Sequence, residues 1–353
     1  MMDFPPLKND RILKVAKGEE VDKVPVWVMR QAGRYLPEFR EVFAKHDFFS
    51  ICQNPELACK ITLQPIERFD LDAAIIFSDI LVVPQALGME VLLKPSLGPV
   101  FTDPLKTPKD MKQLCSSVEA LPKLQYVFEA ITLTRHKLNG KVPLIGFTGA
   151  PWTLMSYMIE GKGSKTMSNS KKWLYTQESL SHKLLQLITD VNIDYLVGQV
   201  KAGAQMLQVF ESHAEYLNLE LFEKFALPYL IQICKKVKTK LEEDKLEPVP
   251  MTLFAKGGHY ALNSIGESGY DVIGLDWTMD PEKSRTILGA NVTLQGNLDP
   301  CALYAPAEDL ESKVKKMGAK FGKSRWIANL GHGIYPDMDP KSMTAFVKAV
   351  HDL

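Results

Sequence analysis

The chain has 353 residues, with 42 Lys and Arg against 42 Asp and Glu, so its formal net charge is zero. Apolar residues make up 46% and charged residues 24%, which are the proportions of a globular protein with a full hydrophobic core. The balanced charge argues against general binding to nucleic acid or to a membrane surface, because both need a basic excess.

The N-terminal sequence and the cysteines indicate the compartment. The chain begins Met-Met-Asp-Phe-Pro-Pro, without the apolar segment of a secretory signal or the Arg/Ser-rich pattern of a transit peptide. The most apolar stretch, 80–89, is too short to span a bilayer. Five cysteines without a Cys-x-x-Cys pair predict free thiols rather than disulfides or structural zinc. We therefore expect a cytoplasmic protein, located in the cytosol, with no membrane or nucleic-acid partner.

Short apolar runs along the chain predict eight buried strands, which alternate with helical patterns. Such alternation implies crossover connections and a parallel sheet. We therefore predict an α/β fold in which residues 1–353 form a single (β/α)8 TIM barrel. The predicted strands are Val24–Met29, Ala73–Phe77, Leu144–Phe147, Met206–Phe210, Met251–Phe254, Val272–Leu275, Val292–Leu294 and Trp326–Ala328.

Several helices carry their own start signals. Asn54-Pro55-Glu56 supplies an N-cap, a first-turn proline and a first-turn acid, and Asp339-Pro340 opens a second helix in the same way. Residues 172–201 and 218–243 are long stretches with apolar residues at helical spacing. The polar segment Gly161–Lys172 predicts a mobile loop.

Polar residues gather directly after the predicted strands. In a barrel of this class the chemistry belongs to the loops at the carboxyl ends of the strands. The pattern therefore predicts an enzyme or a ligand-binding barrel. These segments are Arg30–Arg34, Ser78–Asp79, Thr148–Thr153, Glu211–His213, Ala255–Gly258, Asp276–Trp277, Gln295–Asn297 and Asn329–Gly333.

The first two segments contain the strongest candidates. Arg30 and Arg34 are four residues apart, and two guanidinium groups can each bind a carboxylate or phosphate through paired hydrogen bonds. The alternative is a solvated surface pairing with Glu38 and Glu41. Asp79 ends an apolar run and needs donors or a cation nearby to stay ionised. It is a ligand-binding candidate, but a helix cap or a pairing with Arg30 is an equal alternative.

Three further polar residues are weaker candidates on their own. His332 lies between two glycines, Tyr157 lies in an apolar helical segment, and Ser212 precedes His213. A loop histidine, a packed aromatic ring and a turn residue are the alternatives. No Gly-x-Ser-x-Gly elbow surrounds Ser212, so a hydrolase nucleophile is not expected. Spacing alone indicates no nicotinamide, flavin or metal site.

Taken together, these segments resemble the uroporphyrinogen decarboxylase family of haem biosynthesis. The likeness extends from about Leu7 to His351, and the first of its motifs is the most specific. The motifs that carry it are Pro25–Arg40, Ala74–Leu81, Gly146–Leu154, Phe210–His213, Gln295–Pro300 and Asn329–Pro336.

The resemblance implies a cofactor-free cytosolic homodimer with one (β/α)8 domain per subunit. Its substrate would be uroporphyrinogen, whose four acetate arms lose CO2 to give coproporphyrinogen. Arg30 and Arg34 resemble the arginines that bind substrate carboxylates, with the Ala32 backbone between them, and Asp79 resembles the central carboxylate. Tyr157, Ser212 and His332 resemble the remaining polar contacts around the macrocycle.

The chemistry of the reaction agrees with this assignment. A dome-shaped porphyrinogen directs four pyrrole N–H groups towards one point, where a single carboxylate can accept several of them. Protonation of a pyrrole makes a cation that takes up the electrons left by CO2. An anionic Asp79 would stabilise that cation, and Arg30 would position the reacting acetate and hold or supply the proton.

Two positions depart from the family pattern, and two other functions stay open. Relatives commonly have arginine where this chain has Phe43, which puts the affinity for a propionate in doubt, and glycine where it has Glu215, which we expect to point outward. A methyltransferase of the same barrel family is one alternative, but its zinc needs a His-x-Cys pair, and Phe254-Ala255-Lys256 stands in that region. A non-catalytic tetrapyrrole-binding paralogue is the other.

Overall fold

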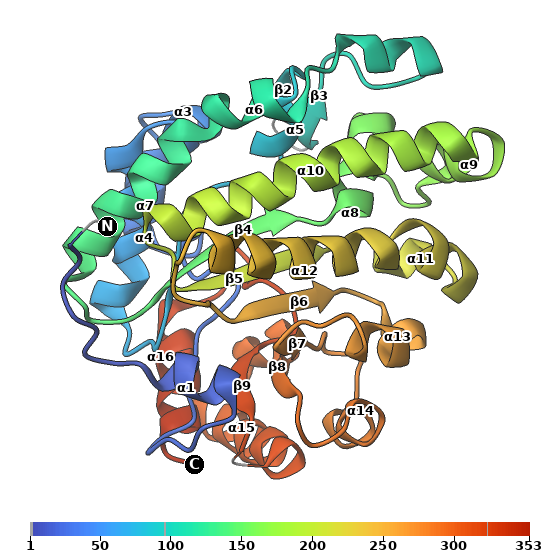
Figure 1. The fold of residues 1–353 in the computed structure, drawn as a ribbon. Coiled ribbons are helices and arrows are strands. Elements are labelled where there is room, and N and C mark those ends of the chain that lie inside the picture. The colour runs from blue at the N-terminus through green and yellow to red at the C-terminus, as the bar shows by residue number, and fades with distance from the viewer. Residues whose placement is uncertain (1–2, 95–96, 323) are drawn as a thin grey trace.

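The computed structural model describes residues 3–94, 97–322 and 324–353 (Figure 1). Seven strands form one parallel sheet in the order β1-β4-β5-β6-β7-β8-β9, and β2 and β3 form a separate antiparallel hairpin. Seven of the predicted strands are therefore present. The bounds are β1 (Ala74–Ile75), β2 (Val91–Lys94), β3 (Gly98–Phe101), β4 (Leu144–Gly149), β5 (Met206–Glu211), β6 (Met251–Ala255), β7 (Val272–Gly274), β8 (Thr293–Leu298) and β9 (Trp326–Leu330).

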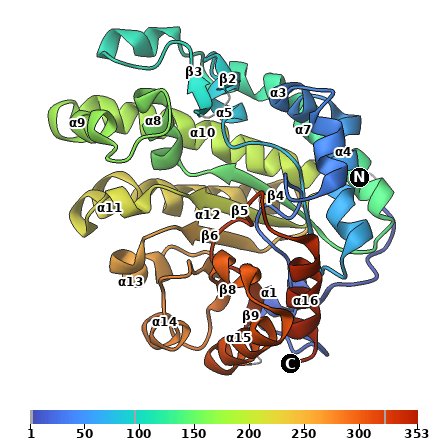
Figure 2. The same cartoon turned by 180° about the vertical axis from the view of Figure 1, so that it is seen from behind.

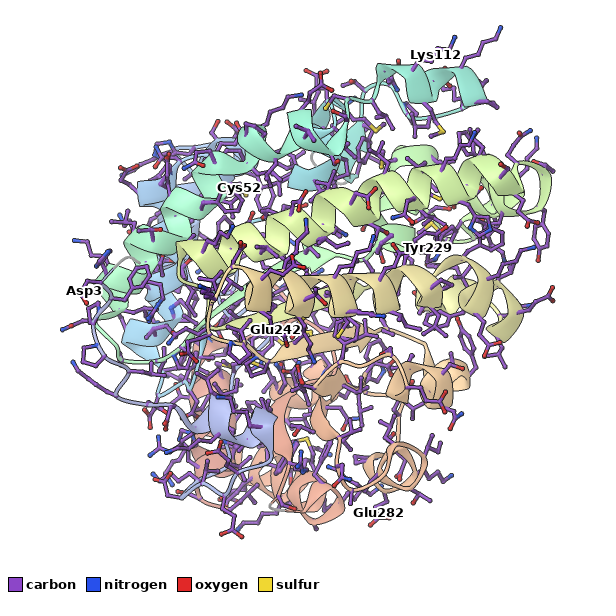
Figure 3. All side chains as sticks on the ribbon, viewed as in Figure 1. Asp3, Cys52, Lys112, Tyr229, Glu242 and Glu282 are labelled. Atoms are coloured by element: carbon purple, nitrogen blue, oxygen red, sulfur yellow. The ribbon has the colours of Figure 1, made fainter. Side chains whose placement is uncertain are left out.

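Helices connect the strands, and α7, α10 and α12 lie along the outer face of the sheet (Figures 1 and 2). The bounds are α1 (Arg11–Lys17), α2 (Pro37–Phe43), α3 (Phe48–Cys52), α4 (Pro55–Arg68), α5 (Val82–Ala86), α6 (Ser117–Ala120), α7 (Gln125–Leu138), α8 (Pro151–Glu160), α9 (Ser168–Thr176), α10 (Glu178–Ala202), α11 (Leu219–Phe225), α12 (Leu227–Glu243), α13 (Leu262–Gly266), α14 (Pro281–Leu288), α15 (Ala307–Phe321) and α16 (Pro340–His351). Exposed charged side chains such as Lys112, Glu242 and Glu282 project from the periphery (Figure 3). Within the described residues, no helix is both long enough and apolar enough to cross a membrane.

The predicted helix starts at residues 55 and 340 are confirmed. The Asn54 side chain accepts a hydrogen bond from the Leu57 N–H, and the Asp339 side chain caps α16 in the same manner. The stretch 218–243 is not one helix but two, because α11 ends before Pro228, which has no N–H to continue the ladder. The expected loop 161–172 is also partly wrong, since α9 begins within it at residue 168.

The prediction of a full strand over Val24–Met29 is wrong. Only Val26 forms a bridge, parallel to β9. Side chains take the backbone donors that a ladder would use: the Val26 N–H donates to Asp72 Oδ2 at 2.9 Å, and the Met29 N–H donates to Asn329 Oδ1 at 3.0 Å. The segment nevertheless lies between β9 and the residues that precede β1, because the Asp72 N–H donates back to the Val26 carbonyl at 2.9 Å.

Two apolar clusters hold the fold together. The larger one lies between the sheet and its helices. The smaller one joins α1 to Trp27 of the 24–29 segment and to residues of several strands, including Ile145 and Met206. A polar chain accompanies it: Trp27 Nε1 donates to Gln295 Oε1 at 2.9 Å, and Gln295 Nε2 donates to Gln208 Oε1 at 3.2 Å. Because β8 and β5 are not neighbours in the sheet, these contacts require the sheet to curl around the smaller cluster.

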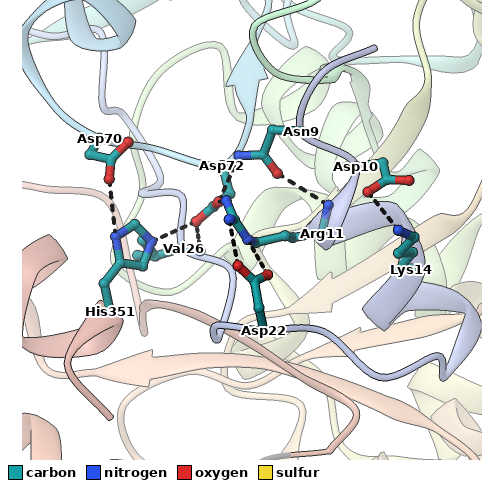
Figure 4. Close-up of polar contacts among 9 residues, drawn as sticks. All are labelled: Asn9, Asp10, Arg11, Lys14, Asp22, Val26, Asp70, Asp72 and His351. Atoms are coloured by element: carbon teal, nitrogen blue, oxygen red, sulfur yellow. Dashed lines mark hydrogen bonds and ion pairs between the residues drawn. The ribbon is translucent and has the colours of Figure 1, made fainter.

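Asp72 ties the chain ends to the amino-terminal end of the sheet (Figure 4). Its buried carboxylate accepts hydrogen bonds from Asn9, Val26, Arg11 and His351. The donors come from α1, from Asn9 two residues ahead of it, from the 24–29 segment and from α16. One carboxylate therefore joins segments that are far apart in the sequence, on the side of the sheet opposite the candidate site.

Candidate active site

Arg30 lies in a turn that its neighbours fix. Its backbone φ of 63° is in the left-handed region, which costs a non-glycine residue about 1–3 kcal/mol and persists only where the surroundings enforce it. The buried Gln31 does so: its side chain accepts from the Val28 N–H at 3.1 Å and donates to the Ala73 carbonyl at 3.0 Å. The Tyr35 hydroxyl donates to the Gln31 carbonyl at 2.8 Å. The Arg30 side chain is left exposed at the carboxyl end of the sheet.

The surface-pairing interpretation of the two arginines is wrong. Glu38 is bound by Arg68, whose Nε and Nη2 donate to it at 2.8 and 3.1 Å. Neither Arg30 nor Arg34 forms an ion pair within the described part of the chain. Arg34 is exposed, and its carbonyl accepts a hydrogen bond from Arg40 Nη1 at 2.8 Å. Within the described ranges, neither guanidinium is therefore paired with a protein acid.

Asp79 follows β1 and is half-buried. Its Oδ1 accepts a hydrogen bond from the Leu81 N–H at 2.8 Å, directly before α5, so the capping alternative is realised by one oxygen. Burial raises the pKa of Asp79, while the Leu81 N–H and the positive charge of Arg30 act in the opposite direction. Asp79 and Arg30 make no direct ion pair, so the carboxylate responds to the arginine without being neutralised by contact.

Tyr157 lies on α8, after β4, and is also half-buried. Its ring centroid is 4.7 Å from that of His213. Burial raises the pKa of the Tyr157 hydroxyl, the negative charge of Asp79 raises it further, and the charge of Arg30 lowers it. Both charges therefore lie near this hydroxyl.

His332 follows β9, with its ring edge-on to Trp277 at a centroid distance of 5.9 Å. Burial, and then the positive charge of Arg30, lower the pKa of His332 to about 4. The imidazole is therefore neutral at physiological pH. Its Nδ1 is buried and has no hydrogen-bond partner among the described residues.

These interactions bring together most of the residues predicted from sequence. Asp79, Tyr157 and His332 each respond to the charge of Arg30, although they follow different strands. The Ser212 N–H donates to Thr153 Oγ1 at 2.8 Å, beside the His213 that packs on the Tyr157 ring. Ala32 is half-buried in the turn after Arg30. Within the described residues, the guanidinium of Arg34 forms no hydrogen bond or ion pair with the others.

The sequence analysis missed Glu211 as a candidate. Its carboxyl is fully buried at the end of β5, where the Thr153 hydroxyl donates to Oε1, and Oε2 has no partner among the described residues. Burial raises the pKa of Glu211 to about 7. An acid between the end of a buried strand and Ser212 was the available signal.

His213 was also missed. Its Nδ1 lies 2.6 Å from the hydroxyl oxygen of the buried Ser156, and burial lowers the pKa of the imidazole to about 3. Its signal was position, because it follows Ser212 at the end of a strand. Glu215 is exposed, as expected, and pairs with Lys256. The Phe43 ring stacks on Phe39 at a centroid distance of 5.8 Å, and the effect of this position on propionate affinity stays a prediction.

The curled parallel sheet has charged and hydroxyl groups beyond the carboxyl ends of its strands. This defines a class of α/β protein that binds its ligand at the carboxyl ends of the strands. The family model described as uroporphyrinogen decarboxylase matches residues 7–353. Uroporphyrinogen decarboxylases from Danio rerio and Homo sapiens are each 60% identical to the chain, covering 99% of it and 95% of their own length. The Ovis aries protein of the same name is 61% identical. The chain belongs to the uroporphyrinogen decarboxylase family.

Solved structures with lower identity share the fold. A methyltransferase from Methanosarcina mazei superposes with a TM-score of 0.82 at 22% identity, covering 99% of both chains. A B12-independent methionine synthase from Shewanella superposes with a TM-score of 0.53 at 11% identity, covering 84% of this chain. At these identities the likeness concerns the fold and not the reaction.

Proposed function

We propose that this chain is a uroporphyrinogen decarboxylase, a carboxy-lyase that converts uroporphyrinogen III to coproporphyrinogen III in haem biosynthesis. Four acetate arms become methyl groups, and four CO2 molecules leave. The observation that carries the proposal is the 60% identity to curated decarboxylases over 99% of the chain. The grouping of Asp79 with Arg30 and Tyr157 supports it.

The proposed domain is one (β/α)8 barrel over residues 1–353, in which the 24–29 segment takes the place of the eighth strand. The bridge from Val26 to β9 and its hydrogen bond with Asp72 support this closure. The substrate cleft would lie at the carboxyl ends of the strands. We further propose a cytosolic homodimer whose two clefts face each other, working without a cofactor.

Asp79 is the proposed central residue. A domed porphyrinogen presents its pyrrole N–H groups to one point, and the Asp79 oxygen that does not bind Leu81 is suited to accept them. The charge also favours a positive ring. A fixed negative group in a partly buried setting interacts with a cation more strongly than it would in water.

The decarboxylation step balances with one proton. A proton adds to a ring carbon of the pyrrole and makes an iminium cation. The bond between the acetate methylene and its carboxylate then breaks, CO2 leaves, and the electron pair neutralises the iminium. Protonation of the exocyclic methylene and loss of the ring proton give the methyl group, so each turn consumes one proton and releases one CO2.

Arg30 is proposed to bind the reacting acetate and to supply the ring proton, either from its guanidinium or from a water that it holds. Its fixed turn supports a positioning role. Arg34 would bind a second carboxylate, and the Ala32 backbone would contact the substrate between them. An Arg30→Lys variant loses the paired geometry, so we expect its kcat/KM to fall at least about tenfold. Near-normal turnover by this variant would contradict the positioning role.

Tyr157, Ser212 and His332 are the proposed remaining contacts. Tyr157 stays protonated, because burial and Asp79 both raise its pKa, so its hydroxyl serves as a hydrogen-bond donor. His332 is neutral, so its imidazole would contact the macrocycle without adding a charge. Ser212 contributes a hydroxyl held in place through its N–H bond to Thr153.

One assay separates the proposed function from its alternatives. The purified protein is incubated anaerobically with uroporphyrinogen, without added metal or cofactor. We expect products with seven, six, five and finally four carboxyl groups. Binding without any loss of CO2 would indicate a tetrapyrrole-binding paralogue. Turnover only with zinc and a methyl donor would indicate the methyltransferase.

A further inference from the structure

An ion pair at the carboxyl ends of β5 and β6 is not used in the mechanism above. Lys256 directly follows β6, and Glu215 lies in the short turn after β5; the Lys256 ammonium contacts Glu215 Oε1. The Glu215 N–H also donates to the Lys256 carbonyl at 3.1 Å. A Cβ on Gly257 would stand 2.4 Å from the Glu215 Cβ, so the two loops touch closely at this point. Main-chain contacts therefore fix both residues, and the side-chain pair is not needed to join the loops.

The charge of Lys256 reaches the candidate site. It lowers the pKa of His213, which follows β5, and the pKa of His332, which follows β9. Because Lys256 directly follows β6, it lies at the carboxyl end of the sheet, where the residues after β5 and β9 also lie. Its side chain is only 19% exposed, whereas that of Glu215 is 37% exposed. Lys256 is thus the more buried partner of the pair, and Glu215 is nearer to solvent.

We propose that Lys256 is a further carboxylate-binding residue of this site, and that Glu215 occupies its ammonium until a carboxylate arm of the substrate replaces it. The inference rests on the proposed function, because uroporphyrinogen carries eight carboxylates and needs cations beyond the two arginines. Glu215 is a carboxylate on a short side chain, so it already shows the geometry in which an acetate or propionate would bind.

The exchange is physically easy. A partly exposed ion pair is weak, so releasing Glu215 costs little, and one carboxylate replaces another at the same ammonium. Lysine suits this role better than arginine would, because its ammonium is a point charge on a flexible stem and accepts partners from several directions. The released Glu215 moves only towards solvent, where it is already exposed.

The test is a double-mutant cycle on substrate binding. The dissociation constant of uroporphyrinogen is measured by anaerobic calorimetry for the wild type, K256Q, E215Q and the double variant, each with Asp79→Asn added so that the substrate is not consumed during the titration. The kcat is measured without Asp79→Asn, and thermal melting checks that each protein is folded. Loss of one charged hydrogen bond predicts a Kd about tenfold higher for K256Q, with a smaller change in kcat. K256R should stay within about threefold of the wild type, because it keeps the charge.

The two carboxylates compete for one ammonium, so E215Q should bind substrate several-fold more tightly than the wild type. In the K256Q background the same change should have no effect, because the competition is gone. K315Q is the matched control: Lys315 pairs with Glu311 on α15, away from the site, and its loss should leave Kd and kcat unchanged.

The outcomes distinguish this inference from the proposed function. An unchanged Kd in K256Q, or an equal effect of E215Q in both backgrounds, would overturn the role of Lys256 even if the wild type releases CO2. If K256Q does not fold, E215Q decides, since a Kd equal to that of the wild type contradicts the competition. If the wild type binds uroporphyrinogen but releases no CO2, the decarboxylase proposal fails, and the cycle still tests Lys256. A wild type that does not bind at all overturns both.

Discussion

Gly333 lies directly beneath the side chain of Arg30. A Cβ built on Gly333 would stand 2.4 Å from Cδ and 2.7 Å from Cγ of that arginine. Real side chains do not approach this closely, so any larger residue at 333 must move Arg30. The glycine after His332 therefore determines where the arginine lies, and this gives the Gly-His-Gly motif a physical reason.

A Gly333→Ala variant should bind and turn over substrate poorly while staying folded. Arg30 is exposed and can swing away from the new methyl group without disturbing the core, so we expect a stability loss below about 1 kcal/mol. The kcat/KM for uroporphyrinogen should fall at least about tenfold. Gly163→Ala is the control, because a Cβ there meets nothing within 4 Å. Equal activity of the two variants would contradict the dependence of Arg30 on Gly333.

Removing the charge of Arg30 should shift the titration of Asp79. Burial raises the pKa of Asp79, and the Arg30 charge opposes that rise, so an Arg30→Gln variant has an even higher Asp79 pKa. The acidic limb of the kcat/KM profile should therefore move to higher pH, in addition to the loss of rate. Arg34→Gln removes an equal charge that does not act on Asp79. The acidic limb of the kcat/KM profile of this variant should therefore stay at the wild-type pH. A shift of the Arg30→Gln limb to lower pH would show that another group titrates.

Glu211 should make the protein less stable as the pH rises. Its pKa is raised from 4.5 to about 7, so the folded state holds a proton that the unfolded state has lost over this range. The stabilisation is complete below pH 4.5 and is lost as the pH rises to about 7, amounting to roughly 3 kcal/mol. The Glu211→Gln side chain stays neutral at all of these pH values. Measured by urea unfolding, the free energy of unfolding of the variant should therefore rise relative to that of the wild type between pH 4.5 and about 7. Parallel curves for the two proteins would contradict a buried, protonated Glu211.

Asp72 should be a major source of stability, with no part in the chemistry. Removing the buried carboxylate leaves its hydrogen-bond donors without an acceptor. Loss of one partner of a buried ion pair costs about 3–5 kcal/mol, so Asp72→Ala should unfold at a much lower urea concentration than the wild type. Its pKa is lowered from 3.8, so the difference from the wild type is full at neutral pH and shrinks as the pH falls below 3.8. The kcat of the folded variant should be unchanged.

The control for Asp72 is Asp10→Ala. Asp10 forms an exposed pair with Lys14 within one turn of helix, which contributes about 0.2–0.5 kcal/mol (Figure 4). A similar loss in the two variants would show that Asp72 does not hold the amino-terminal end of the sheet together.

The parallel sheet could be predicted from the sequence because each of its strands is a local apolar run. The 24–29 segment has the same pattern, but its ladder is replaced by bonds to Asp72 and Asn329, which are distant in sequence. The hairpin of β2 and β3 escaped prediction because it is short and exposes Leu92 and Leu93, so no buried alternation marks it.

The candidate site also combines residues that could be predicted from local sequence with residues whose roles depend on partners distant in sequence. Arg30 and Asp79 could be proposed from strand topology, which brings the residues after parallel strands to one face, whereas Tyr157 and His332 could be proposed only through the family resemblance. The roles of Glu211 and Lys256 depend on partners that no local pattern reveals. Glu211, at the end of β5, is bound by Thr153 on α8, and Lys256, after β6, is bound by Glu215, which follows β5.

The most direct test of the account is the turnover of an Asp79→Asn variant. Wild type and variant are incubated anaerobically with uroporphyrinogen, and the rate of CO2 release and the carboxyl number of the products are followed. Asparagine keeps the size of the side chain but carries no charge, so the positive ring loses its stabilisation. The account predicts a fall in kcat of at least about 100-fold in a variant that melts like the wild type. Four-carboxyl product formed at the wild-type rate would contradict it.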